Sequence, residues 1–279
     1  MTASIDRAAT RPSAPARRPA SQRFKRYVPL LSGVGVALFV ISIWHIASTS
    51  GWVSAIFLPP PSAILAAFGR LIQTGYVDST LLQHMGASLA RVFAALAFAV
   101  VIGVPAGLLI ATSPIGRGVL DPVIEFLRPL PPLAYLPLVI IWFGIGETAK
   151  VLVILLSMIP AITIATAAGA RSASKNQVNA ARAFGASPLQ LLWHVLLPSA
   201  LPSIITGIRI ALGAGWTTLV AAELVAAGRG LGYMIQSAAQ FLVTDVVIAG
   251  ILVISAIAFA FEALLRFIER RYVPWAHNQ

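Results

Sequence analysis

The sequence predicts an all-α integral membrane protein with about six transmembrane helices. Of its 279 residues, 58% are apolar and 10% are charged, whereas soluble domains are about half apolar and a quarter charged. Such a chain has too little polar surface for water, so its solvent must be lipid. A transmembrane helix needs about 20 mostly apolar residues. The stretches that meet this need are residues 27–47, 88–111, 121–143, 149–170, 203–226 and 244–266.

The first 26 residues are predicted to form a disordered basic tail in the cytoplasm. They contain several prolines, one acidic residue and seven of the 20 lysines and arginines. A segment of this composition cannot bury a core, and its charge is attracted to an anionic membrane surface. Binding of nucleic acid is disfavoured, because no aromatic or folded basic module accompanies the tail. The apolar stretch 27–47 is too long for the core of a secretion signal, so we interpret it as the first span.

The distribution of positive charge predicts the orientation. Loops on the cytoplasmic side of a membrane protein are enriched in lysine and arginine. Placing the N-terminal tail in the cytoplasm puts seven further cations on that side and three on the other. The seven are Arg117, Arg171, Lys175, Arg182, Arg266, Arg270 and Arg271, and the three are Arg70, Lys150 and Arg229. We therefore expect a multi-pass membrane protein with both termini, including the tail 267–279, in the cytoplasm.

Residues 48–87 are expected to lie outside the membrane. Within this segment, residues 62–73 have the apolar spacing of an amphipathic helix, which would lie along the outer surface. Residues 88–266 form the predicted membrane core. Its third span, 121–143, is interrupted by several prolines, and broken helices persist in lipid only where protein or a water-filled cavity satisfies the freed carbonyl groups. This span is therefore predicted to border a pathway. A short helix over 233–241 is expected at the outer mouth.

Residues 171–202 form the longest polar interruption between spans, which is typical of a functional loop. Residues 177–184 favour a helix, and Gly185 suits the left-handed position that ends one. Ser187, Pro188 and Gln190 then have the spacing of a capping box with proline at the first helical position. We predict a helix, a sharp turn and a second helix that runs to Pro198 and Pro202, where the chain turns back toward the membrane.

This loop resembles the coupling loop of ABC importer permeases. The family pattern is Glu-Ala-Ala, three residues, Gly, nine residues, Ile, one residue, Leu-Pro. Asn179 stands where the family has glutamate, which puts in doubt any salt bridge that the glutamate makes. The matching positions in this chain are Ala180, Ala181, Gly185, Val195, Leu197 and Pro198. The segments 128–150, 207–224, 230–251 and 270–275 are similar to the nitrate, sulfonate and taurine group of importers, and most similar to taurine permeases.

The resemblance implies a type I ABC importer permease fold with cytoplasmic coupling helices. It implies a homodimer that works with two ABC ATPase subunits and an extracytoplasmic binding protein, while pairing with a paralogue stays open. The substrate would be taurine or a related alkanesulfonate, with nitrate, another sulfonate or a vitamin precursor as alternatives. No cofactor is expected in this chain, because ATP and Mg²⁺ would be bound by the ATPase.

Enzyme chemistry finds no support in the sequence. None of Lys25, Lys150 and Lys175 ends a phosphate-binding Gly-Lys-Ser/Thr motif, and the glycine-rich stretch 228–232 follows no predicted strand. The four histidines are scattered and form no HExxH motif, and there is no cysteine. An intramembrane protease would rest on membrane location alone. A self-sufficient carrier or channel is the rival of another class, but it leaves the 171–202 loop unexplained.

Five residues are candidates for a substrate pathway. Ionisable groups in spans usually face protein or water because exposure to lipid is costly. Glu223 could border a path or sit in water at the rim, and the nearby threonines could instead bond their own helix. Arg128 on the third span could attract an anionic sulfonate or pair with Glu125 on the same helix face. The five candidates are Arg128, Trp216, Thr217, Thr218 and Glu223. Arg209 is expected to pair with a neighbouring span or a lipid phosphate.

Overall fold

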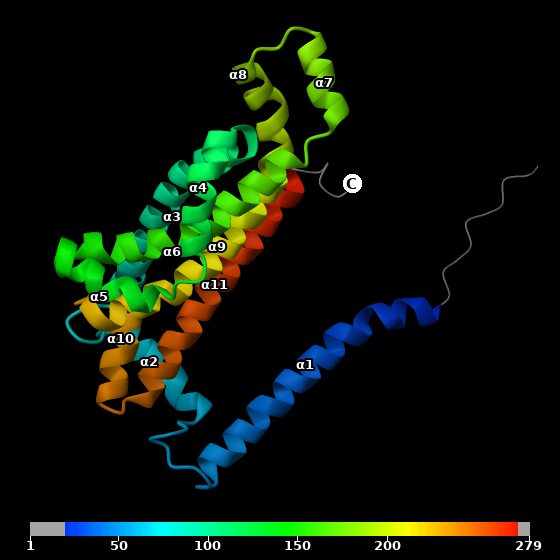
Figure 1. The fold of residues 1–279 in the computed structure, drawn as a ribbon. Helices are drawn as coiled ribbons and strands as arrows, with labels where there is room; N and C mark the ends of the chain where they lie inside the picture. Colours follow the sequence, from blue (N-terminus) through cyan, green and yellow to red (C-terminus); the bar gives the residue numbers. More distant parts are fainter. Residues whose placement is uncertain (1–19, 273–279) are drawn as a thin grey trace, which may run out of the picture. The chain divides into compact units, whose positions relative to one another are not determined.

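The computed structural model describes residues 20–272, and its elements are all helices (Figure 1). The chain divides into two compact units, one ending at Pro61 and one beginning at Ser62. In the described range, five helices are long and apolar enough to cross a membrane, or six if the bent pair α4 and α5 forms one span. The predicted all-α architecture with about six spans is confirmed.

The first unit is built on helix α1 (Ala20–Thr49). It begins seven residues before the predicted start at residue 27, so the prediction of a disordered tail is wrong for residues 20–26. The first 19 residues of the predicted tail lie outside the described residues. From Ser32 onward the helix exposes mostly apolar side chains, such as Val36 and Phe39, which suits contact with lipid.

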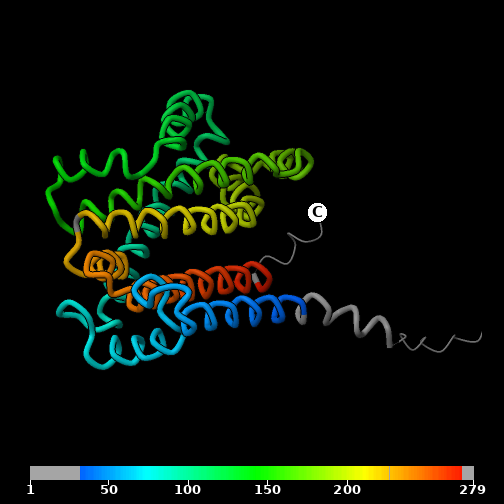
Figure 2. The backbone as a smooth tube through the Cα atoms, turned by 90° about the horizontal axis from the view of Figure 1, so that it is seen from below, coloured from blue at the N-terminus to red at the C-terminus, as the bar shows by residue number. Residues whose placement is uncertain are grey.

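The second unit has a core of long helices. Figures 1 and 2 show α6 and α9 side by side along most of their length. Helix α3 packs on α6, and Ile154, Met158 and Leu219 are among the side chains buried between the helices. The long helices are α3 (Leu81–Thr112), α6 (Glu147–Arg171), α9 (Leu197–Ala226) and α11 (Thr244–Tyr272).

Helix α3 begins seven residues earlier than predicted. Thr80 caps it by accepting a hydrogen bond from the Gln83 N–H at 3.3 Å, and the Gln83 side chain accepts one from the Thr80 N–H at 2.9 Å. This capping box is readable in the sequence, but Gln83 and His84 interrupt the apolar run from which the start of the span was predicted. The amphipathic helix predicted at 62–73 is observed as α2 (Pro61–Gln73), which buries Ile64 and Leu71.

The third predicted span consists of two helices. Helices α4 (Pro114–Leu127) and α5 (Pro132–Phe143) are inclined by 105° across a break of four residues. The break is rich in proline, which removes backbone donors and disfavours helical conformation in the preceding residue. The predicted interruption of this span is therefore confirmed.

The 171–202 loop stands out from one end of the bundle (Figure 1). The predicted turn back at Pro198 and Pro202 is wrong, because helix runs without a break over Pro188–Val225. The Leu197 N–H bonds to the Leu192 carbonyl in a π-helical turn, and this wider turn accommodates the missing N–H of Pro198. The elements of the loop are α7 (Lys175–Ala183), α8 (Pro188–Leu191) and the π-helix η1 (Leu192–Leu196).

The opposite end of the bundle closes with two helices. The short helix predicted over 233–241 is observed as α10 (Leu231–Gln240). Helix α11 continues to Tyr272, beyond the predicted end of the last span at residue 266. Residues 273–279 of the predicted C-terminal tail lie outside the described range.

The close approach of α3 to α6 depends on small residues. A Cβ atom on Gly107 would lie 2.5 Å from the Thr163 carbonyl oxygen, whereas one on Gly86 of the same helix would meet nothing within 4 Å. We expect Gly107→Ala to lower the free energy of unfolding by about 1–3 kcal/mol through overpacking. Gly86→Ala, the matched control, should leave it unchanged or raise it by about 1 kcal/mol. Thermal unfolding in detergent measures both, and equal stabilities would contradict the packing argument.

Candidate functional site

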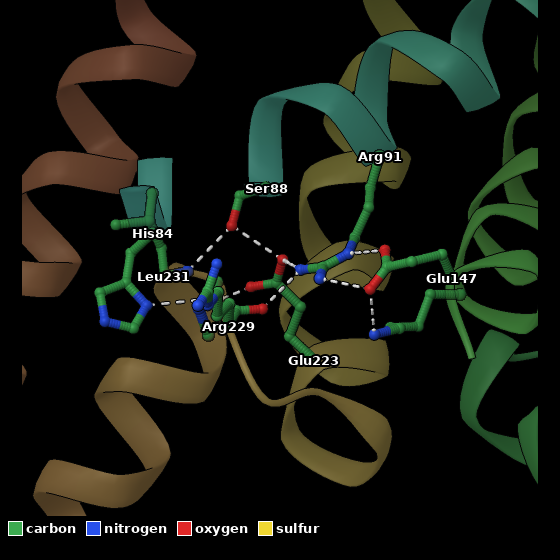
Figure 3. A network of polar contacts seen from close by, with 10 residues as sticks. His84, Ser88, Arg91, Glu147, Glu223, Arg229 and Leu231 are labelled. Atoms are coloured by element: carbon green, nitrogen blue, oxygen red, sulfur yellow. Dashed lines mark hydrogen bonds and ion pairs between the residues drawn. The ribbon is translucent and has the colours of Figure 1, made fainter. Parts of the chain in front are cut away.

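Four charged residues form a cluster where α6 begins and α9 ends, at the end of the bundle opposite the 171–202 loop. Figure 3 shows this cluster from close by. Arg91 of α3, Glu147 and Lys150 of α6, and Glu223 of α9 come together because two of these helices begin and one ends here. Arg91 donates to both oxygens of Glu147, at 2.6 and 2.8 Å, and to Glu223 at 2.5 Å. Lys150 donates to Glu147 at 2.7 Å. We call these four residues the charged cluster.

Burial makes the charged cluster rigid. Glu223 is fully buried, and Arg91 and Lys150 are 4% and 3% exposed, whereas the Glu147 side chain is 63% exposed. An isolated buried charge is very costly, so each of these cations needs its carboxylate. The two positive and two negative charges balance. The cluster therefore joins α3, α6 and α9. Loss of any one of these contacts would leave a buried charge without its partner.

The cluster also holds the loop between α9 and α10. The second oxygen of Glu223 accepts a hydrogen bond from the Gly232 N–H at 2.8 Å, and Arg91 donates to the Arg229 carbonyl at 2.7 Å. Gly230 has a φ of +139°, and a Cβ atom there would lie 2.4 Å from the Glu223 carboxyl carbon. The glycine-rich stretch 228–232 is thus wrapped around a carboxylate.

Two polar residues of α3 complete this arrangement. Ser88 donates to Glu223 at 2.7 Å and accepts from the Leu231 N–H at 2.8 Å. His84 Nδ1 accepts from the Gly230 N–H at 3.1 Å, so the ring proton is on Nε2, which donates to the Tyr76 carbonyl at 2.9 Å. Ser88 and His84, which contact the 228–232 stretch, are therefore each oriented by a second hydrogen bond.

Sequence reasoning found one member of this network and missed the others. Glu223 was singled out, but Ser88 and Arg91 were not, although Arg91 lies inside the predicted span 88–111. A charge at that depth requires a partner, and this was the available signal. The predicted pairing of Arg209 with a neighbouring span is confirmed, because it contacts Glu262 and Glu269 of α11 at 2.8 and 3.0 Å.

The 171–202 loop has the predicted local geometry. Gly185 adopts a φ of +80°, and the capping box of Ser187 and Gln190 is formed with Pro188 at the start of α8. Asn179 and Ala180 are exposed on α7, and Ala181 is half-buried. The remaining three motif positions, Val195, Leu197 and Pro198, are half-buried where the loop joins α9.

The pathway candidates of α9 face two directions. Trp216, Thr218 and Glu223 are buried within the bundle, whereas Thr217 is exposed. Both threonines bond their own helix, Thr217 to the Gly213 carbonyl at 3.2 Å and Thr218 to the Ala214 carbonyl at 2.9 Å. Their place along a substrate pathway stays a prediction.

Arg128, the remaining candidate, follows α4 at the bend of the broken span. It borders a cavity of about 440 Å³ between the α4–α5 break and the middle of α6 and α9. We call it the central cavity. Among residues 20–272 no ion pair joins Arg128 to Glu125, so the predicted pairing on one helix face is not formed. The walls of the cavity include Leu127, Ser157, Pro160, Ala161, Ile210 and Ala214.

Comparison with known proteins identifies the family. The description "Binding-protein-dependent transport system inner membrane component" matches residues 103–274, well over half of the chain. The chain belongs to this family of ABC transporter permeases. The permease is 50% identical to the taurine transport system permease protein TauC of Escherichia coli, over 87% of this chain and 88% of the relative. It is 36% identical to the putative aliphatic sulfonates transport permease protein SsuC of Escherichia coli, over 92% and 95%.

Solved structures support the permease fold. An inward-facing structure of the MetNI methionine ABC transporter covers 67% of this permease and 95% of its own chain, with a TM-score of 0.55 and 24% identity. An amino acid ABC transporter covers 74% and 96%, with a TM-score of 0.56 and 21% identity. At these identities the likeness concerns the fold. The family match, the similar permeases and the apolar helices make this permease a multi-pass protein of the inner membrane.

The loop around Glu223 provides a test of the charged cluster in this permease. Gly230→Ala places a methyl group against the buried carboxylate at a φ that favours glycine, whereas Gly228→Ala meets nothing within 4 Å. We expect Gly230→Ala to destabilise the permease by about 1–3 kcal/mol and Gly228→Ala to change it little. Thermal unfolding and hydrogen exchange of residues 227–243 measure the difference. Equal protection of this segment in both variants would refute the role assigned to Glu223.

Proposed function

We propose that this permease is the membrane-spanning subunit of an ATP-driven importer for taurine or a related alkanesulfonate. The observation that carries the proposal is the 50% identity with a taurine permease over most of both chains. The 36% identity with a putative sulfonate permease supports the wider substrate class. Both substrates carry a sulfonate group, which is a permanent anion at physiological pH.

ATP would be hydrolysed by separate subunits, because the sequence contains no phosphate-binding Gly-Lys-Ser/Thr motif. These ATPases would hold ATP and Mg²⁺. The 171–202 loop supplies their docking surface, since it protrudes from the bundle and exposes Phe184 (92%), Leu189 (64%) and Trp193 (58%). Large exposed apolar groups at the tip of a loop are typical of an interaction site. Asn179, in place of the family glutamate, would contact the ATPase through its amide and without a salt bridge.

The assembly would contain two copies of the permease, two ATPase subunits and a soluble binding protein on the outer face. In the orientation predicted from the positive charges, both termini and the 171–202 loop would be cytoplasmic, and the charged cluster would lie near the outer face. Closure of the two ATPases would move the two loops together and reopen the helices to the other side. Thr217 lies on the exposed face of α9 shared with Ile210 and Ala214, and it would border the path nearer to the outer face.

The decisive test is ATP hydrolysis by the permease reconstituted in lipid with its ATPase. Binding protein loaded with taurine, another sulfonate or nitrate is added in separate samples. We expect the taurine-loaded protein to stimulate hydrolysis most. Stimulation by another loaded protein would retain the importer and remove taurine as the substrate. No stimulation in an assembled complex would contradict coupling altogether.

The turn at Gly185 should be essential for coupling. A β-branched residue at this φ costs about 1–3 kcal/mol, although a Cβ atom would meet nothing within 4 Å. Each 1.4 kcal/mol lowers the population of the competent loop about tenfold. We expect Gly185→Val to reduce stimulated hydrolysis about tenfold or more without loss of membrane insertion.

Ala183→Val, in the neighbouring helical turn, is the matched control and should retain most of the stimulation. A Gly185→Val complex that hydrolyses ATP like the unmodified one would show that the left-handed turn is dispensable.

A further inference from the structure

The central cavity extends from mid-depth in the bundle toward the 171–202 loop, since its walls also include Ile164, Ala165 and Ala168 of α6. Ser157, Pro160 and Ala161 are near the middle of α6, and Ile210 and Ala214 are near the middle of α9. A helix rises 1.5 Å per residue and the hydrocarbon core of a bilayer is about 30 Å thick. Residues near the middle of these spans are therefore roughly 15 Å from either lipid headgroup region.

The exposed Arg128 brings a positive charge to the wall of this cavity without a carboxylate partner. Within the described residues, the buried and half-buried cations of the spans, Arg91, Lys150 and Arg209, all contact carboxylates. Arg128 has no ion pair in the same range, and the rest of the cavity wall is apolar except for Ser157. An arginine in the middle of a membrane costs several kcal/mol unless water or an anion faces it. Among the described residues, no carboxylate forms an ion pair that would neutralise Arg128.

We propose that Arg128 binds the sulfonate group of the transported substrate in the central cavity. This inference rests on the proposed function, which makes the cargo a small organic anion. A guanidinium group presents several N–H donors in a plane and can bind two oxygens of one anion. The cavity volume of about 440 Å³ accommodates a small molecule and a few waters.

The position of the cavity decides between a substrate and a lipid as the source of the anion. A lipid phosphate stays in the headgroup region and does not reach the middle of the bilayer. The 105° bend between α4 and α5 lies beside the cavity, and Arg128, which lies in this break, borders it.

Binding of radiolabelled taurine to the full permease–ATPase complex in nanodiscs tests the proposal. Unmodified complex is compared with Arg128→Gln and Arg128→Lys, and Glu125→Gln is the matched control one helical turn away. A hydrogen bond to a charged group corresponds to a change of roughly tenfold or more. We expect Arg128→Gln to weaken taurine binding at least about tenfold, Arg128→Lys to restore part of it, and Glu125→Gln to leave it unchanged or tighter.

Ethanolamine, which lacks the sulfonate, provides the second readout. Arg128→Gln should abolish the preference for taurine over ethanolamine, which a purely structural residue would not affect. Should Arg128→Gln fail to assemble, Ala214→Leu fills the cavity while retaining the arginine, and it should also abolish taurine binding.

Unchanged taurine binding in an assembled Arg128→Gln or Ala214→Leu complex, with import by the unmodified complex intact, would overturn the site and leave the proposed function standing. Equal losses in Glu125→Gln and Arg128→Gln, with no further loss in the double variant, would assign Arg128 to a structural pair. Failure of the unmodified complex to respond to any sulfonate-loaded binding protein would instead refute the proposed function.

Discussion

The contact between Glu223 and Arg91 fixes one end of the bundle. Both side chains are removed from water, so their attraction is little screened and neither can lose its partner without a large penalty. Arg91 also forms an ion pair with Glu147. These two contacts of Arg91 join α3 to the beginning of α6 and to the end of α9. The backbone of residues 228–232 then folds around the same carboxylate. The placement of α10 and the return of the chain into α11 follow from these contacts.

Apolar periodicity and local capping signals were enough to predict most of the fold. The spans, the broken third span, the amphipathic α2 and the turn at Gly185 all depend on interactions within a few residues, and such interactions are visible in a single sequence. The early starts of α1 and α3 were missed because polar side chains hid helical segments that extend past the apolar stretch. The turn expected at Pro198 is absent because a π turn accommodates the missing N–H of this proline and lets the helix continue. The π turn depends on the helix on either side of it.

The functional residues were harder to predict because they meet across the bundle. Glu223 and Arg91 are separated by more than a hundred residues. The local sequence around either residue does not predict that the other is its partner. Ser88 and His84 resemble ordinary polar residues at the start of a span until the 228–232 loop is placed against them. Arg128 presents the opposite case. Its expected neighbour Glu125 is close in sequence and on the same helix, yet the described residues contain no ion pair between the two, and Arg128 borders the central cavity.

The unbroken helix over Pro188–Val225 has a mechanical consequence. Its 38 residues have a length of about 57 Å along the helix, with the protruding loop at one end and the buried Glu223 near the other. A helix held firmly at one end acts as a lever. Over that length, a tilt of about 5° would displace the free end by roughly 5 Å. Movements imposed on the loop would thus reach the middle of the membrane through continuous helix, reduced in proportion to the distance from the anchored end.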